Sequence, residues 1–214
     1  MRIASTFFCL MMVLVFAPQA TAQVLTTDNN NNGFNGDGAG VYFDLTDLTG
    51  TGLRIDSFET SVFASTGDFV TAELWVRDGS YVGNIDSDAG WTLLGSVGGV
   101  ASADTNGSFG FLTEFDTPDH DIAAGATNGF ALLTDFGIAY QGVGGTATTD
   151  FNDGNLAFFG DTAFTGVFGT GVNLTPRVFS GSITYAQISQ VPEPGNAAVV
   201  LLGLAGMIVR RNRR

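Results

Sequence analysis

The only histidine of the sequence, His120, lies between Asp119 and Asp121 in the segment TPDHDIAAG. A histidine beside a carboxylate can act as the base of a Ser-His-Asp triad, but no serine here occupies the Gly-x-Ser-x-Gly turn that presents such a nucleophile. A zinc site would need further histidines or cysteines, and the only cysteine is Cys9, near the N-terminus. We therefore predict that His120 lies in a polar turn and takes no part in catalysis.

Pairs of carboxylates are the second group that could do chemistry. A glycosidase places two of them across a cleft, about 5 Å or about 6.5–9.5 Å apart. The glutamates available for this role are Glu59, Glu73 and Glu114. Residues 23–190 contain twenty acidic residues, so these three are not singled out by their presence alone.

Two loops rich in Asn and Asp have the alternation that suits an oxygen-ligated Ca²⁺ ion. The segment DNNNNG resembles the first half of an EF-hand loop, but Ala39 stands where the bidentate glutamate should be. A second loop, NIDSDAG, repeats the alternation. Solvated turns are the alternative interpretation of both loops. The candidate Ca²⁺ ligands are Asp28, Asn30 and Asn32 in the first loop, and Asn84, Asp86 and Asp88 in the second.

Aromatic residues near the second loop could contact a ligand. Trp75, Tyr81 and Trp91 lie close together in the sequence, with amide and carboxylate residues between them. On a sandwich face or a loop rim, they could bind polysaccharide weakly. The abundant phenylalanines are instead expected to fill the core.

The charge of residues 23–190 is strongly negative. Three arginines oppose the twenty acids and lysine is absent, which gives a net charge of −17. Nucleic acids and anionic membrane surfaces are disfavoured as partners, because phosphate contacts require cations that are scarce here. Solubility in salty or divalent-rich water explains this acidity most simply. A cationic partner is the alternative.

The same region has the pattern of an all-β protein. In DFVTAELWVRDG, the apolar residues Val70, Ala72, Leu74 and Val76 alternate with polar ones, and Asp78-Gly79 marks a turn. Comparable short runs are GVYFDL, LRIDSFETSVF, WTLLGSV, SFGFLTEF, GFALLTDF, LAFFG and RVFSGSITYAQI. Eight or more such strands predict an antiparallel two-sheet sandwich with jelly-roll connectivity. The sandwich should span residues 40–190, after an Asn/Gly-rich flexible lead-in at 23–39.

The first 22 residues have the features of a secretory signal peptide. Arg2 precedes an apolar run over 7–17, and Ala20-Thr21-Ala22 supplies the small residues of a cleavage site. Cleavage after Ala22 would remove Cys9. The exported chain could then form no disulfide and would depend on its core or on bound ions.

The C-terminal segment, residues 191–214, has three consecutive parts. Pro192 and Pro194 keep the chain extended. An apolar stretch over 197–209 follows, roughly 20 Å long as a helix against a hydrocarbon core of about 30 Å. Four arginines then favour retention on the cytoplasmic side. The residues of this signal are Val191, Pro192, Glu193, Pro194, Arg210, Arg211, Arg213 and Arg214.

This order of parts resembles the PEP-CTERM sorting signal of Gram-negative bacteria. The resemblance implies processing by signal peptidase and by an exosortase, with delivery to the cell surface or an exopolysaccharide-rich matrix. An ordinary tail anchor is the alternative. The body also resembles exported bacterial β-sandwich modules of unassigned function, in the phrases GVYFDL, LWVRDGSYVG, GWTLLG, IAAGATNGFAL and PRVFSGSITY.

Two classes of function remain after these observations. We expect a non-catalytic, biofilm-associated surface or matrix protein, because no catalytic constellation can be named. The alternative is an extracellular glycan-active enzyme that uses a carboxylate pair.

Overall fold

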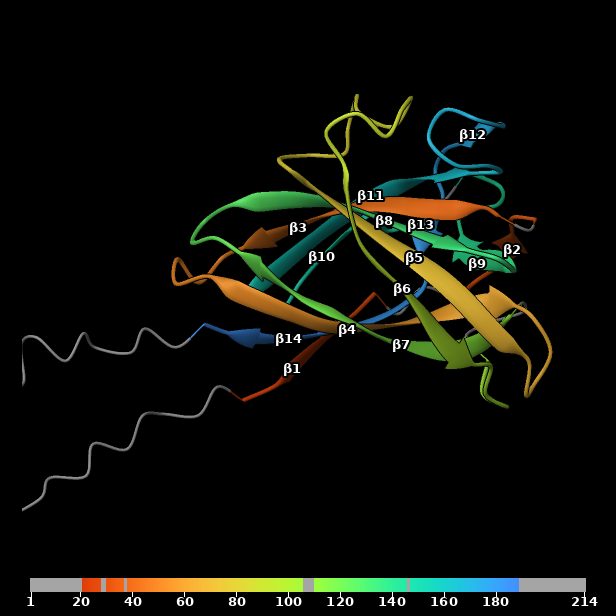
Figure 1. Cartoon of the computed structure of the whole chain (residues 1–214), viewed down its shortest axis with the longest axis horizontal. Helices are drawn as coiled ribbons and strands as arrows, with labels where there is room; N and C mark the ends of the chain where they lie inside the picture. The colour runs from red at the N-terminus through yellow and green to blue at the C-terminus, as the bar shows by residue number, and fades with distance from the viewer. Residues whose placement is uncertain (1–20, 28–29, 37, 106–109, 146, 189–214) are drawn as a thin grey trace, which may run out of the picture. The chain divides into compact units, whose positions relative to one another are not determined.

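The computed structural model describes residues 21–188 except 28–29, 37, 106–109 and 146 (Figure 1). The predicted sorting signal, Ala20 and Asp28 lie outside the described residues. Residues 20–188 form one compact unit. Within the described part of the chain, no helix is long and apolar enough to cross a membrane.

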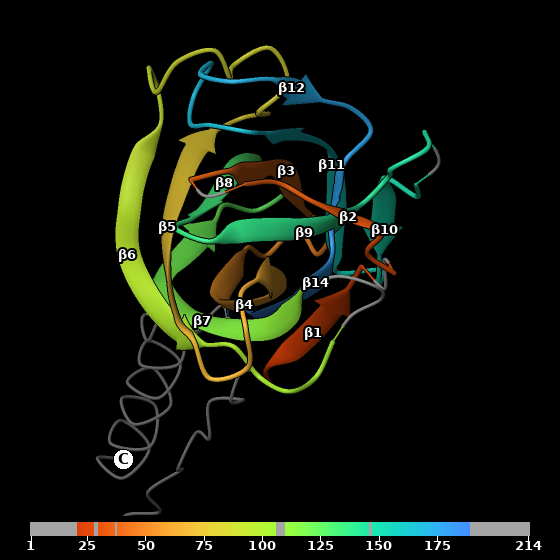
Figure 2. The ribbon, with the colours of Figure 1, turned by 90° about the vertical axis from the view of Figure 1, so that its right-hand side faces the viewer.

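Two antiparallel sheets of seven strands each form this unit (Figure 2). The first sheet has the strand order β1-β14-β4-β9-β13, with β2 paired to β9 and β7 paired to β4. Its strands are β1 (Gln23–Thr26), β2 (Gly33–Phe34), β4 (Leu53–Phe63), β7 (Phe111–Ile122), β9 (Gly137–Gln141), β13 (Val178–Phe179) and β14 (Gly181–Gln187).

The second sheet has the order β10-β11-β3-β8-β5-β6, with β12 paired to β11. Its strands are β3 (Gly40–Asp47), β5 (Phe69–Asp78), β6 (Thr92–Val100), β8 (Thr127–Thr134), β10 (Asp150–Asn152), β11 (Leu156–Phe164) and β12 (Asn173–Leu174). The predicted all-β class with two antiparallel sheets is therefore confirmed. A sandwich is consistent with this arrangement.

A cluster of phenylalanine rings is part of the core between the sheets. Phe43 of β3 is fully buried, and its ring lies 5.2–5.8 Å, centroid to centroid, from those of Phe58, Phe130, Phe158 and Phe179. These partners come from four different strands, β4, β8, β11 and β13. These five phenylalanines thus fill the core, as the sequence predicts, whereas Phe34, Phe63 and Phe69 are exposed.

The segment 23–39 differs from the expected flexible lead-in. Strand β1 pairs with β14 from Gln23 opposite Tyr185 to Thr26 opposite Ser182, and β2 pairs with β9. The Thr27 hydroxyl donates to the carbonyl oxygens of Phe179 and Gly181. The described residues of this segment are therefore part of the first sheet.

The first and last strands of the unit meet at one edge. The side-chain amide of Asn155 donates to Gln23 Oε1 over 3.0 Å, and Gln187 donates to Asn155 Oδ1 over 3.2 Å. Asn155 thus connects the first residue of β1 with the last residue of β14. The chain enters and leaves the folded unit at neighbouring points.

Candidate functional site

A groove lies on the face of the second sheet that points away from the core. One hollow, of about 340 Å³, is lined by Glu73, Trp75, Ser87, Asp88, Leu133, Val167, Phe168 and Thr170. A second, of about 240 Å³, is lined by Gly38, Thr71, Glu73, Ser96, Leu133, Thr134, Asp135 and Val167. The two hollows share Glu73, Leu133 and Val167, so they adjoin, and together they are called the groove below. Small-molecule sites typically begin at about 300 Å³.

The two-residue period of β5 places the central side chains of this groove. Val70, Ala72, Leu74 and Val76 are buried in the main core. Thr71, Glu73 and Trp75 consequently point to the opposite face, because successive side chains of a strand alternate. Leu133 of the neighbouring strand β8 is only 5% exposed and belongs to the groove lining.

The carboxylates of the groove are held by short-range hydrogen bonds. Glu73 Oε2 accepts from the indole N–H of Trp75 over 3.1 Å. Asp135 Oδ1 accepts from the backbone N–H groups of Thr71 and Phe136. Each carboxylate therefore has a fixed position and a second oxygen without a hydrogen-bond partner among the described residues.

One wall of the groove is the loop 165–172, in which Phe168 has a φ of 35°. This left-handed conformation is unfavourable for a residue with a Cβ atom. The Phe168 N–H donates to the Tyr42 hydroxyl, and its ring packs at 5.1 Å from Trp75 and 5.4 Å from Trp91. These contacts hold Phe168 in its strained conformation and fix the wall in place.

The second wall is the loop 79–91, which packs directly on the first. A Cβ atom on Gly169 would lie 2.2 Å from the Asp86 carbonyl oxygen, so the two loops touch through their backbones. Around this contact a small second core covers the sheet. Its buried members are Tyr42, Tyr81, Ile85, Trp91, Ala131, Leu133 and Phe164.

Of the three predicted ligand-binding aromatic residues, only Trp75 lines the groove. Tyr81 is 1% exposed and donates to Asp161 Oδ1, while Trp91 is 7% exposed and donates to the Asn84 carbonyl oxygen. Burial raises the pKa of the Tyr81 hydroxyl, and its hydrogen bond to Asp161 raises it further. Tyr81 and Trp91 therefore fix the loop 79–91 and present no open surface to a ligand.

A buried polar network anchors the same loop. Asp44 Oδ2 accepts from the Ser80 hydroxyl over 2.5 Å, and its Oδ1 accepts from the Tyr81 N–H over 2.8 Å. Burial raises the pKa of Asp44, although these hydrogen bonds and the nearby Arg77 oppose that shift. The Arg77 guanidinium lies over the Trp91 ring at 5.6 Å. This network has a structural role in positioning the loop.

The predicted Ca²⁺ ligands lie in two separate places. The Asn84 amide donates to the carbonyl oxygens of Ser80 and Val82, whereas Asp86 and Asp88 are exposed. In the other loop, Asn30 is exposed. Asn32 Oδ1 already accepts from the N–H groups of Gly142 and Val143. Over the described residues, no group of three or more His, Cys, Asp or Glu residues is suited to a metal ion.

The three candidate glutamates are divided between the sheets. Glu59 and Glu114 lie directly opposite each other on β4 and β7, whereas Glu73 lies on β5 of the second sheet. Glu73 and Glu114 thus do not form a pair across one cleft. Within the groove, the carboxylates that accompany Glu73 are Asp88 and Asp135.

The prediction of a polar turn at His120 is wrong. This residue lies within strand β7, its ring is edge-on to the buried Phe130, and its Nε2 atom is buried without a hydrogen bond. Strand β7 continues through Pro118 because its pairing with β4 is interrupted by a bulge there. Burial lowers the pKa of His120, although Asp121 and Asp78 oppose that shift.

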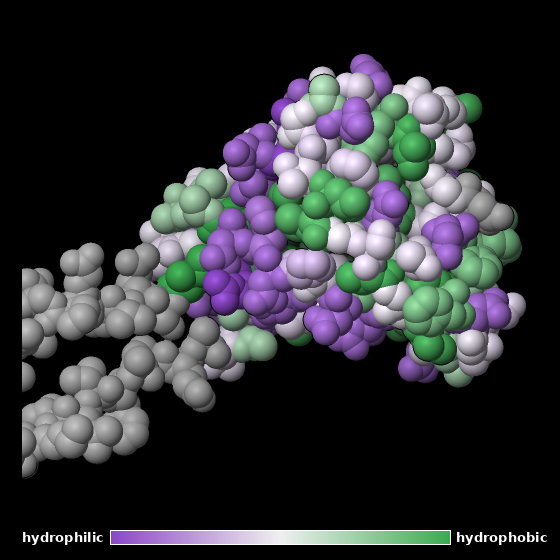
Figure 3. Space-filling model, viewed as in Figure 1, coloured by the Kyte–Doolittle hydropathy of each residue, from purple (hydrophilic) through white to green (hydrophobic). Residues whose placement is uncertain are grey.

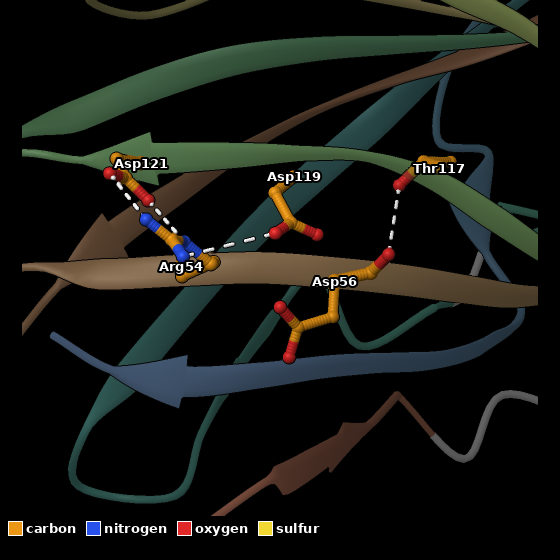
Figure 4. Close-up of polar contacts among 5 residues, drawn as sticks. All are labelled: Arg54, Asp56, Thr117, Asp119 and Asp121. Carbon is orange, nitrogen blue, oxygen red and sulfur yellow. Dashed lines mark hydrogen bonds and ion pairs between the residues drawn. The ribbon is translucent and has the colours of Figure 1, made fainter. Parts of the chain in front are cut away.

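The aspartates that flank His120 lie on the other face of β7, around Arg54 (Figure 4). Arg54 contacts both oxygens of Asp121, over 2.7 and 3.1 Å, and lies 3.9 Å from Asp119. The Arg54 hydrogen bond lowers the pKa of Asp121. Burial and the negative charge of Asp119 raise the pKa of the adjacent Asp56. This cluster is a charged strand surface, and none of its residues lines either of the two hollows described above.

Sequence reasoning missed Asp135, Val167 and Phe168 as members of the groove. The run TGVFGTG contains three glycines in seven residues, which could have indicated a tightly folded loop.

On the face of the molecule seen in Figure 3, small hydrophobic groups are interspersed among hydrophilic residues.

The comparisons with known proteins assign no family. No protein-family model and no curated protein matches the chain. Among solved structures, the cysteine protease and lectin-like domains of Cwp84, a surface-layer-associated protein of Clostridium difficile, are similar at 12% identity and a TM-score of 0.41. That match covers 71% of this chain and 32% of the other. The structure of the Gx strain of infectious bursal disease virus matches at 12% identity and a TM-score of 0.30. That match covers 90% of this chain and 38% of the other. The chain therefore spans about a third of the length of these structures.

Proposed function

We propose that this protein is an exported, non-catalytic component of the cell surface or extracellular matrix, where it contacts polysaccharide through the groove. The observation that carries the proposal is the hydrogen-bonded pair of Glu73 and Trp75 inside a groove with a fixed aromatic wall. An indole beside carboxylate and hydroxyl groups offers a sugar both an apolar contact and hydrogen-bond acceptors.

Delivery to the surface rests on the C-terminal segment 191–214 and on the signal peptide, both inferred from sequence. Gln23 and Gln187, the first residue of β1 and the last residue of β14, are both hydrogen-bonded to Asn155, so the described body begins and ends at neighbouring points. The C-terminal apolar helix and the jelly-roll connectivity remain predictions.

Substitutions in the tail test the sorting signal. Replacing Pro192 and Pro194 with alanine should leave export intact and block processing, because the extended segment beside the helix is lost. Replacing Arg210, Arg211, Arg213 and Arg214 with glutamine should weaken retention before processing. The measurement is the intact mass of protein recovered from the native cell surface. A mass that still includes residues 197–214 would show an ordinary tail anchor.

A glycan array tests the groove. Wild-type protein should bind at least one polysaccharide, and Trp75→Ala should weaken that binding by about tenfold or more, a loss of about 1.4 kcal/mol. Val24→Ala is the matched control, since Val24 is exposed on β1 of the other sheet. An array without any hit would refute glycan binding and favour a purely structural role.

The enzymatic alternative has one supporting observation, which is that Glu73 shares the groove with Asp88 and Asp135. Incubation of the wild-type protein with each bound polysaccharide would reveal shortened products. Turnover that is abolished in both Glu73→Gln and Asp135→Asn would replace our proposal with a carboxylate-dependent glycosidase.

A further inference from the structure

We propose that the groove selects polysaccharide chains that carry primary amines. This inference rests on the proposed function, because it names the class of glycan that the same groove would take. Three of the residues that line the two hollows are acidic, namely Glu73, Asp88 and Asp135, and neither set of lining residues includes a lysine, an arginine or a histidine.

The arginines of the described body are all engaged elsewhere. Arg54 is paired with Asp121 on the first sheet. Arg77 shares the outward face of β5 with Glu73 and Trp75, but its guanidinium lies over the Trp91 ring and it lines neither hollow. Arg177 donates to two backbone carbonyl oxygens and lies over the Tyr140 ring. No arginine therefore lines either hollow, in a body that already carries a large excess of negative charge.

The walls of the groove strengthen the effect of its charge. Trp75, Leu133, Val167 and Phe168 are apolar, and a cleft lined by one sign of charge between low-dielectric walls concentrates the field inside it. A uronate or sulfated chain would be repelled. An uncharged chain would gain only the hydrogen bonds and the apolar contact.

An ammonium group matches the lining in two further ways. It donates three hydrogen bonds, and Glu73 and Asp135 each retain one oxygen without a hydrogen-bond partner among the described residues. It is also attracted to the face of an aromatic ring, most strongly to that of tryptophan. Trp75 is held at the groove by its bond to Glu73, so the carboxylate and the ring face can act on one sugar.

Titration calorimetry with three soluble oligosaccharides of equal length separates the contribution of ligand charge from those of hydrogen bonds and apolar contact. The three oligosaccharides are a β-linked glucosamine oligomer, its fully N-acetylated counterpart and a β-linked glucose oligomer. At a mildly acidic pH that protonates the amines, the glucosamine oligomer should bind at least about tenfold more tightly than the other two. Its affinity should fall as salt is added, because the charge contribution is screened.

Two groove variants and one matched control locate the effect. Glu73→Gln and Asp135→Asn should each weaken binding of the glucosamine oligomer several-fold more than binding of the glucose oligomer, because only the charged ligand loses an ionic partner. Glu114→Gln removes the same charge from an exposed position on the other sheet and should change neither. An equal loss in Glu114→Gln would show non-specific attraction to an acidic protein and would overturn the inference.

The remaining outcomes distinguish the two proposals. Equal or tighter binding of the acetylated or glucose oligomer would overturn the selection for amines and leave glycan binding in place. Absence of binding for all three, together with an empty glycan array, would overturn the proposed function itself.

Discussion

Gly99 of β6 lies against Glu114 of β7, so that a Cβ atom on Gly99 would be 2.4 Å from the Glu114 carbonyl oxygen and 2.5 Å from Thr113 Cγ2. Strand β6 is the edge of the second sheet, and β7 belongs to the first. The absence of a side chain at Gly99 thus allows the two sheets to approach each other at this edge.

Gly99→Ala should therefore destabilise the protein by about 1–3 kcal/mol, the usual cost of forcing extra atoms into a packed site. Denaturant unfolding monitored by tryptophan fluorescence gives the change. Gly36→Ala is the control, because a Cβ atom on Gly36 meets nothing within 4 Å and its φ is not in the left-handed region. Equal losses in the two variants would contradict the close approach of β6 and β7.

The central position of Phe43 leads to a second prediction. Its ring contacts aromatic partners on four strands of both sheets, so Phe43→Ala should cost about 3–5 kcal/mol of unfolding free energy. The total unfolding free energy of a typical domain is only about 5–15 kcal/mol. Phe69→Ala removes a ring that is 65% exposed and should change stability by about 0.5 kcal/mol or less. A small effect at Phe43 would show that the two sheets do not share this core.

The pattern of alternating residues was sufficient to predict the longer strands. Runs such as LRIDSFETSVF and DFVTAELWVRD became β4 and β5, because each has one apolar face that must be buried. Strands β2 and β12 have only two residues each and carry no such pattern. They form because longer strands offer them hydrogen-bond partners, and that information comes from the tertiary structure.

The groove was only partly predictable for a similar reason. Trp75 could be placed on an outward face from the period of β5, but Trp91 could not, because the loop 79–91 folds back over the sheet and buries it. Asp135 enters the groove through its bond to the Thr71 N–H, 64 residues away in sequence. Pairing of β5 with β8 is what brings these two residues together.

The burial of His120 predicts a pH dependence of stability. Because the pKa of His120 is lowered in the folded state, the unfolded state binds more protons near its ordinary pKa of about 6.5. Stability should consequently rise with pH through this range and fall as the histidine protonates below it. His120→Phe keeps an aromatic ring beside Phe130 and removes the proton site.

Urea unfolding from about pH 5.5 to about pH 7.5 tests this effect, since the range spans the ordinary histidine pKa. The wild-type unfolding free energy should rise more steeply with pH, or fall less steeply, than that of His120→Phe. Comparison of the two proteins removes the contributions of Asp44 and Asp56, whose raised pKa values change stability in the opposite direction. Identical slopes for the two proteins would indicate that His120 is exposed to solvent in the folded state.

The Arg54 cluster predicts a salt-dependent change. Arg54→Gln should lower the thermal midpoint at low ionic strength, because Asp121 and Asp119 lose their only described ion-pair partner. The difference should shrink in about 1 M salt, where the screening length is about 3 Å. Glu114→Gln should instead raise the thermal midpoint at low ionic strength, since it removes a like charge directly across from Glu59. A midpoint difference that is independent of salt would contradict an electrostatic origin.

Calcium binding, which the Asn/Asp loops suggest, can be decided by melting the purified protein in EDTA and then in millimolar Ca²⁺ at matched ionic strength. An ion present at 100 times its dissociation constant would add about 2.7 kcal/mol to stability. Any stabilisation should involve the loop of Asp86 and Asp88, whose carboxylates are exposed, because the oxygen of Asn32 already accepts two backbone N–H groups. Asp86→Asn combined with Asp88→Asn should then abolish the calcium effect, whereas Asn32→Ala should lower the midpoint equally with and without the ion. Equal midpoints in EDTA and Ca²⁺ for the wild-type protein would mean that both loops are ordinary solvated turns.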